Sequence, residues 1–150
     1  MKIYIASDHR GVEVENNIAQ YLKQMGMSVE RSKIEHTPTD DYVDFAFELA
    51  NHVVEEDALG ILLCGTGIGM SIAANKVKGI RAARCVDVDD AFYAKNHNDA
   101  NVICLSSSIK LDYLYEIVDT FINTKRASEE KHLNRINKII NYESSAYNEL

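Results

Sequence analysis

A chain of 150 residues is long enough to bury one hydrophobic core and too short for two ordinary domains, so we expect a single domain over residues 1–150. With 46% hydrophobic and 26% charged residues, the composition is typical of a globular protein. The net charge of −7 argues against nucleic acid or anionic membranes as partners, because both require a surplus of Lys and Arg. An anionic ligand must therefore be bound by a local cluster of donors.

The N-terminus and the cysteines indicate the compartment. The first apolar run reaches polar residues at Ser7 and Asp8, too soon for a secretory signal, and no apolar stretch approaches the roughly 20 residues that cross a bilayer. Cys64, Cys85 and Cys104 are odd in number and lack metal-ligand spacing, which favours free thiols. We expect a cytoplasmic protein without a structural metal.

Short apolar runs alternate along the chain with longer amphipathic stretches, which is the pattern of a βα repeat. The expected strands are 2–7, 28–32, 59–64, 80–86 and 101–105. The expected helices are 12–25, 42–56, 69–77, 89–96, 110–123 and 128–141, followed by a polar tail, 141–150, that is expected to fray. This alternation implies an α/β fold with right-handed crossovers and a doubly wound sheet of five parallel strands.

The strand 59–64 is apolar almost throughout, as expected of a central strand covered by helices on both faces. In such sheets, ligands bind beyond the carboxyl ends of the strands. The segments expected at this edge are 7–11, 64–69, 85–87 and 106–108.

Cys64 begins a glycine-rich segment in which Gly65, Gly67 and Gly69 alternate with other residues before a helix. Glycines let backbone N–H groups turn toward a ligand, and the helix adds its positive end, so the segment predicts an anion-binding turn. The same field favours a thiolate, which makes Cys64 a candidate base or nucleophile. The alternative is a buried cysteine beside a merely tight turn, and the glycines favour the functional interpretation.

Familiar loops are excluded by their spacing. The segment lacks the lysine of a P-loop and the GxGxxG spacing of a dinucleotide-binding turn. Met70 occupies the place of the arginine that a cysteine phosphatase loop requires. What remains is a cysteine facing a small anion or oxyanion.

Other polar residues are candidates with plain alternatives. Asp8 and His9 end the first strand. Asp8 is suited to bind a sugar hydroxyl, and His9 to donate to a phosphate or ring oxygen. The alternative is that Asp8 caps the next helix and the His9 ring is solvated. Asp41 precedes a helix, where capping is again the alternative. His97 ends a helix whose dipole favours a cation, which suits a proton shuttle, although lone surface histidines are commoner.

Taken together, six motifs resemble the ribose-5-phosphate isomerase B family, which also contains the galactose-6-phosphate isomerase subunits. The resemblance covers about residues 1–140, and its most specific parts are CGTGIG and HNDANV. The motifs lie at 7–9, 41–42, 64–69, 73–76, 79–82 and 97–102.

The resemblance implies a Rossmann-like fold, a homodimer or dimer of dimers with shared active sites, a sugar-phosphate substrate, and no cofactor or metal. It makes Cys64 the base that takes the C2 proton. Some relatives use instead a carboxylate at the position of Met70, and a methionine there cannot act as a base. The resemblance makes His97 the group that opens the sugar ring, reaching the site with Asn98 from the partner subunit. The enediolate oxygens would be held by Gly65, Thr66, Gly67, Ile68 and Gly69. The hydroxyls would be bound by Asp8, Asp41, Tyr42 and Asn98.

Departures from the family pattern concern the phosphate. The family usually carries Gly-Gly-Arg or Gly-Ser-Arg at 106–108, where this chain has three serines, and its C-terminal arginine pair becomes Lys131 and Arg135. Arg10, where the family usually has a small residue, would compensate, or else is a solvated arginine. The expected phosphate ligands are thus His9, Arg10, Lys131 and Arg135.

The leading prediction is interconversion of ribose 5-phosphate and ribulose 5-phosphate. The same reaction on galactose 6-phosphate, allose 6-phosphate or a tetrose phosphate is the nearest alternative. A non-catalytic protein that binds a sugar phosphate is a further one, against which the joint presence of Cys64, Thr66 and His97 argues.

Overall fold

The computed structural model describes residues 1–148, which form one α/β domain around a five-stranded parallel sheet. The strand order is β2-β1-β3-β5-β4, so β3 is central and the predicted doubly wound architecture is confirmed. The strands are β1 (Lys2–Ser7), β2 (Ser28–Arg31), β3 (Leu59–Cys64), β4 (Ala82–Arg84) and β5 (Val102–Ser106).

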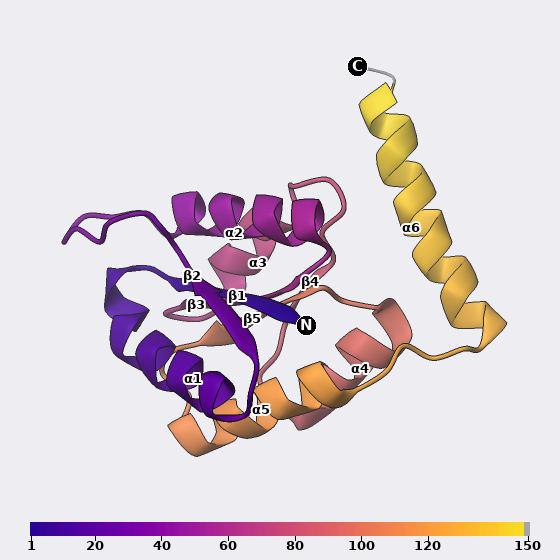
Figure 1. Ribbon diagram of the computed structural model, residues 1–150. Coiled ribbons are helices and arrows are strands. Elements are labelled where there is room, and N and C mark those ends of the chain that lie inside the picture. Colours follow the sequence, from indigo (N-terminus) through magenta and orange to yellow (C-terminus); the bar gives the residue numbers. More distant parts are fainter. Residues whose placement is uncertain (149–150) are drawn as a thin grey trace.

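Helices cover both faces of the sheet, with α2 and α3 on one side and α1, α4 and α5 on the other (Figure 1). Helix α6 extends away from this body and contacts it through α4 and through the Glu143 carboxylate, which accepts a hydrogen bond from the Gly79 amide at 2.9 Å. No helix within residues 1–148 has the length and apolar character to span a bilayer. The helices are the short 3-10 turn η1 (His9–Gly11), α1 (Val12–Gln24), α2 (Tyr42–Glu56), α3 (Ile68–Ala74), α4 (Val88–Asn98), α5 (Leu111–Asn123) and α6 (Glu130–Asn148).

The central strand β3 determines which way Cys64 faces. Successive strand residues point to opposite faces, so Ile61 and Leu63 pack in the core beneath α1, α4 and α5. Leu62 and Cys64 belong to the other core, beneath α2 and α3. The cysteine therefore ends β3 on the side of the sheet that carries the glycine-rich turn and α3.

Several predicted boundaries differ from the structure. Helix α3 ends before residue 77 and β4 is shorter than 80–86, because the Asn75 side chain bonds both backbone groups of Ala82 and joins the two elements by a tight connection. Helix α4 begins earlier than expected, where the Asp87 carboxylate accepts a hydrogen bond from the Asp90 amide. Helix α6 continues past 141 to Asn148 where a frayed tail was expected, and residues 149–150 lie outside the described chain.

Two of the family-like motifs bind each other at the end of α4. The Asn101 side chain bridges the amide of Arg81 and the carbonyl of Gly79. The Arg81 guanidinium in turn donates to the carbonyls of Asn98 and Asp99. These contacts fix the last turn of α4 and with it the position of His97.

A buried carboxylate joins β1, α1 and β2 near the start of the site. Glu15 is 2% exposed, and its two oxygens accept from the Ser7 hydroxyl at 2.8 Å and from Nε of Arg31 at 2.6 Å. Burial of a carboxylate is tolerated only when such donors replace water. Ser7 directly precedes Asp8, so this contact also anchors the chain where it leaves β1.

We expect Glu15→Ala to lower the free energy of unfolding by about 1.5–3 kcal/mol, because charge-assisted hydrogen bonds to Arg31 and Ser7 are lost together. Urea denaturation at neutral pH measures the change. Glu13→Ala is the matched control, since Glu13 lies in the same first turn of α1 but is exposed. Equal losses in the two variants would contradict a role for the buried contacts.

Candidate active site

An open cleft of about 520 Å³ lies at the carboxyl ends of β1 and β3. It brings together residues from three segments that are distant in the sequence. Its lining consists of Asp8, Arg10, Tyr42, Cys64, Gly65, Thr66, Ile68, Gly69 and Ile72. Most of the residues predicted from the sequence thus share one surface, although Ile72 was not among them.

The thiol of Cys64 sits against the glycine-rich turn. Its Sγ accepts a hydrogen bond from the Gly67 amide at 3.1 Å, and the residue is 5% exposed. Gly67 has φ +80°, and a Cβ there would lie 3.1 Å from the carbonyl carbon of Leu105. Glycine is therefore required both for the backbone conformation and for the close approach to β5.

Tyr42 covers the far side of the same turn. A Cβ at Gly69 would lie 2.5 Å from Cζ of the tyrosine ring, so only glycine permits this contact. The hydroxyl of Thr66 accepts a hydrogen bond from the Ile68 amide, the first of α3, at 3.2 Å. The turn and the beginning of α3 are thus held in one shape, with Tyr42 forming a wall of the cleft.

The two aspartates predicted to bind hydroxyls have different positions. Asp8 accepts from the Arg10 amide at 3.1 Å, caps η1 and lines the cleft. Asp41 accepts from the Val43 amide at 3.0 Å and caps α2, outside the residues that line the cleft. The contact of Asp41 in this chain is therefore that of a helix cap, the alternative role given above.

His9 is held by Asp40, a residue to which the sequence assigned no role. One carboxylate oxygen of Asp40 accepts from the backbone amide of His9 at 3.0 Å and lies 2.7 Å from Nδ1 of its ring. The other oxygen lies 2.8 Å from Nδ1 of His36 and accepts from the Thr37 amide. Burial opposes ionisation of Asp40, but these hydrogen bonds outweigh it and hold its pKa well below the usual range.

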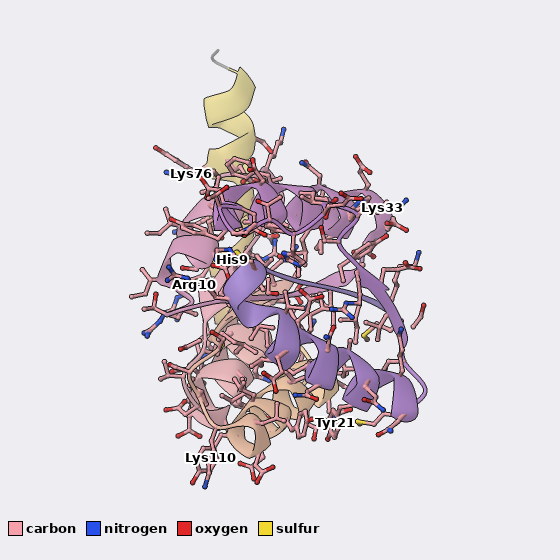
Figure 2. All side chains as sticks on the ribbon, turned by 90° about the vertical axis from the view of Figure 1, so that its left-hand side faces the viewer. His9, Arg10, Tyr21, Lys33, Lys76 and Lys110 are labelled. Atoms are coloured by element: carbon pink, nitrogen blue, oxygen red, sulfur yellow. The ribbon has the colours of Figure 1, made fainter. Side chains whose placement is uncertain are left out.

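Arg10 follows His9 in η1, and Figure 2 labels both residues at the N-terminal end of α1. Its side chain lines the cleft and is exposed. Within the described part of the chain no carboxylate forms an ion pair with its guanidinium. Arg10 is thus available to an anion in the cleft.

The other predicted ligands lie away from this cleft. His97 is in the last turn of α4, and its ring stacks on that of His132 with centroids 4.0 Å apart. Burial lowers the pKa of His132, and the adjacent His97 lowers it further. Lys131 and Arg135 lie on α6 with His132. Asn98 lies at the end of α4 and lines a separate hollow together with Ile139 and Glu143 of α6.

Two of the three serines at the end of β5, Ser106 and Ser107, contact the glycine-rich turn. The Ser106 hydroxyl donates to the Gly65 carbonyl at 2.6 Å and lies 2.6 Å from the Ser108 hydroxyl. The amide of Ser107 donates to the Cys64 carbonyl at 2.9 Å. Arg84, at the end of β4, donates from Nε to the Thr66 carbonyl at 2.9 Å. Donors at the ends of β5 and β4 thus bind the carbonyls of the turn.

Comparison with known proteins agrees with this geometry. A family model described as Ribose/Galactose Isomerase matches residues 3–139. The chain belongs to this family. Its resemblance to the ribose-5-phosphate isomerase B family, stated above from motifs, is thereby confirmed, and so is its class as an isomerase.

Relatives and solved structures in the family match over nearly the whole chain. A probable ribose-5-phosphate isomerase B of Mycoplasma pneumoniae is 44% identical, with 94% of each chain covered. The structure of ribose-5-phosphate isomerase B from Mycoplasma genitalium with bound ribulose-5-phosphate matches with a TM-score of 0.89 and 41% identity, covering 95% of this chain and 96% of that one. The Clostridium thermocellum enzyme matches with a TM-score of 0.91 and 39% identity, covering 97% and 99%.

Besides Ile72, four residues of the site region were not found from the sequence. Asp40 was passed over because it precedes the helix cap Asp41, and His36 because it stands alone in a loop. Arg84 was placed inside a longer strand, although it ends β4 at the same sheet edge as Cys64. His132 lies between Lys131 and Arg135, to which the sequence analysis assigned phosphate binding, and it received no role. Had β4 been predicted to end at Arg84, this residue would have been expected near the site, because the carboxyl ends of parallel strands meet at one edge of the sheet.

The contacts of Asp40 predict one tautomer for two histidines. An ionised carboxylate only accepts hydrogen bonds, so Nδ1 of neutral His9 and of neutral His36 must carry the proton. ¹⁵N NMR of the imidazole rings at alkaline pH should show the Nδ1–H form for both. Asp40→Ala should remove this preference at both rings, while His52, which lacks Asp40 as a partner, serves as the internal control. An Nε2–H form of His9 in the unaltered protein would contradict the arrangement.

Proposed function

We propose that the protein interconverts ribose 5-phosphate and ribulose 5-phosphate through an enediolate, with Cys64 as the base. The observation that carries the proposal is the position of Cys64 Sγ in a cleft whose rim is the glycine-rich turn, 3.1 Å from the Gly67 amide. The family membership and the relative that binds ribulose-5-phosphate support this substrate.

The chemistry requires two features that the cleft supplies together. A proton beside a carbonyl is weakly acidic, so its removal needs a positioned base and donors for the oxyanion that forms. Cys64 provides the base, since an N–H donor directed at sulfur is the contact that a thiolate accepts. The backbone amides of the turn, including that of Thr66, and those at the start of α3 provide the donors. Asp8 and Tyr42 line the same cleft and are placed to bind sugar hydroxyls.

We further propose that the active unit is a homodimer or a dimer of dimers, in which His97, Asn98, Lys131 and Arg135 complete the cleft of the partner. In one chain these residues do not line the cleft that contains Cys64. Helix α6, which carries two of them, extends from the body and exposes large apolar side chains, including Ile139 at 50% and Tyr142 at 78%. Exposed apolar surface of this extent is typical of interaction sites.

The phosphate would be bound by His9 and Arg10 from one chain and by Lys131 and Arg135 from the other. A dianion that leaves water needs several charge-assisted donors, and Ser108 supplies none of the charge of the family's arginine. Arg10 lines the cleft without an acidic partner among the described residues. A coupled assay with a panel of pentose, hexose and tetrose phosphates distinguishes ribose 5-phosphate from the alternative substrates. We place the enzyme in the cytoplasm, where such phosphates occur.

Cys64→Ala should abolish isomerisation, with a loss in kcat of at least about 10²-fold, because it removes the base but leaves the turn intact. Exchange of the C2 hydrogen with solvent, followed by NMR, should vanish with it. Cys85→Ala is the control, since Cys85 is 1% exposed in the core and its pKa is raised by burial, and by Asp90 and Asp87, to about 12. Persistent C2 exchange in Cys64→Ala would identify another base.

Shared sites make a different prediction, because each variant of a mixed dimer can supply what the other lacks. Cys64→Ala and His97→Ala proteins, each inactive alone, should regain activity after subunit exchange through one intact site per heterodimer. Exchange itself is verified with differently tagged chains. A verified heterodimer without activity would refute the sharing of sites.

A further inference from the structure

Three consecutive carbonyls of the glycine-rich turn accept hydrogen bonds from outside the turn. The Cys64 carbonyl accepts from the Ser107 amide at 2.9 Å, and the Gly65 carbonyl accepts from the Ser106 hydroxyl at 2.6 Å. The Thr66 carbonyl accepts from Nε of Arg84 at 2.9 Å. These donors come from the end of β4, the end of β5 and the residue that follows β5, and none of them lines the cleft.

Holding a carbonyl also fixes the next amide. In a trans peptide the C=O and the following N–H point in opposite directions, and the described chain has no cis peptides. Ser106 therefore sets the direction of the Thr66 N–H, and Arg84 sets that of the Gly67 N–H, which is the donor to Cys64 Sγ. In residues 1–148 no protein oxygen accepts from the Thr66 amide, so it remains available to a ligand.

The proton of the Ser106 hydroxyl has a defined direction. A hydroxyl has one proton, and Ser106 gives it to the Gly65 carbonyl, because a carbonyl can only accept. The Ser108 hydroxyl must then donate to Ser106, which also accepts from the Ser108 amide. Ser106 and Ser108, which stand in place of the family's glycine and arginine, thus form a relay of two hydrogen bonds, from the Ser108 hydroxyl to the Ser106 hydroxyl and from there to the Gly65 carbonyl.

We infer that Ser106 and Arg84 are positioning residues that direct the amides of Thr66 and Gly67 into the cleft for the oxyanion and the thiolate. This inference rests on the proposed function. Ser106 is 7% exposed, which protects its hydrogen bond from competition with water. Arg84 is exposed, so its charge is screened and its role is mainly geometric.

The kinetic test separates positioning from substrate binding. Ser106→Ala and Arg84→Ala should each lower kcat by about tenfold, below the cost of deleting an oxyanion donor outright, with KM changed less than about threefold. Ser106→Thr, which keeps the hydroxyl, should restore most of kcat. Ser28→Ala, the same chemical change at an exposed site on the opposite edge strand, should have no effect. Unchanged kcat, or a raised KM with unchanged kcat, overturns the inference, and the latter result for Arg84 marks it as a phosphate ligand.

A second measurement does not depend on turnover. ¹⁵N relaxation of the ligand-free protein should show lower order parameters at Thr66 and Gly67 in Ser106→Ala and Arg84→Ala, and no change in Ser28→Ala. Unchanged order parameters in both variants overturn the inference even if kcat falls. If the unaltered protein turns over no sugar phosphate, the proposed function fails, while the relaxation result still decides whether these residues position the turn.

Discussion

The register between β3 and β5 is the constraint on which the site depends. Parallel pairing sets Cys64 opposite Ser106, so the glycine-rich turn begins where β5 ends. Gly67 then packs against the backbone of Leu105 and Cys104 too closely for any side chain. A shift of one residue would turn Cys64 toward the core beneath α1, α4 and α5 and would separate the serines from the turn. Core packing of β3 therefore also fixes the chemistry at its end.

The division of the predicted residues between two regions follows from the fold. Residues at the carboxyl ends of β1 and β3 share one cleft because parallel strands end at one edge. His97 lies at the opposite end of α4, which begins after β4 and runs back along the sheet. One copy of the chain cannot bring the last turn of α4 to the start of α3, whose N-terminus lies beside Cys64. The proposed sharing of sites thus follows from helix direction, and α6, which extends from the body, carries two of the residues assigned to the partner's site.

Sequence periodicity predicted the elements wherever burial dominates. The bounds of β1, β3 and α2 were found from apolar patterns, and the alternation of strands and helices gave the parallel direction of the five strands but not their order. Boundaries failed where side chains bind backbone, as at Asn75 and at the Asp87 cap. The same limit explains the missed site residues, because the contact of His9 with Asp40 and that of Thr66 with Arg84 join segments that no local pattern relates. The glycines and Cys64, in contrast, form a local signal.

The loss of the family's arginine after β5 changes how charge is distributed around the substrate. A serine cannot neutralise a phosphate, but Ser106 and Ser108 replace a charged contact with a neutral relay on the Gly65 carbonyl. In a protein with net charge −7, Arg10, a cation that lines the cleft, then has greater weight. His9 lies against the buried carboxylate of Asp40, which offsets its charge when it is protonated and fixes its orientation. In the proposed site, the attraction that one chain exerts on the phosphate therefore depends mainly on Arg10, while His9 contributes a donor of fixed orientation.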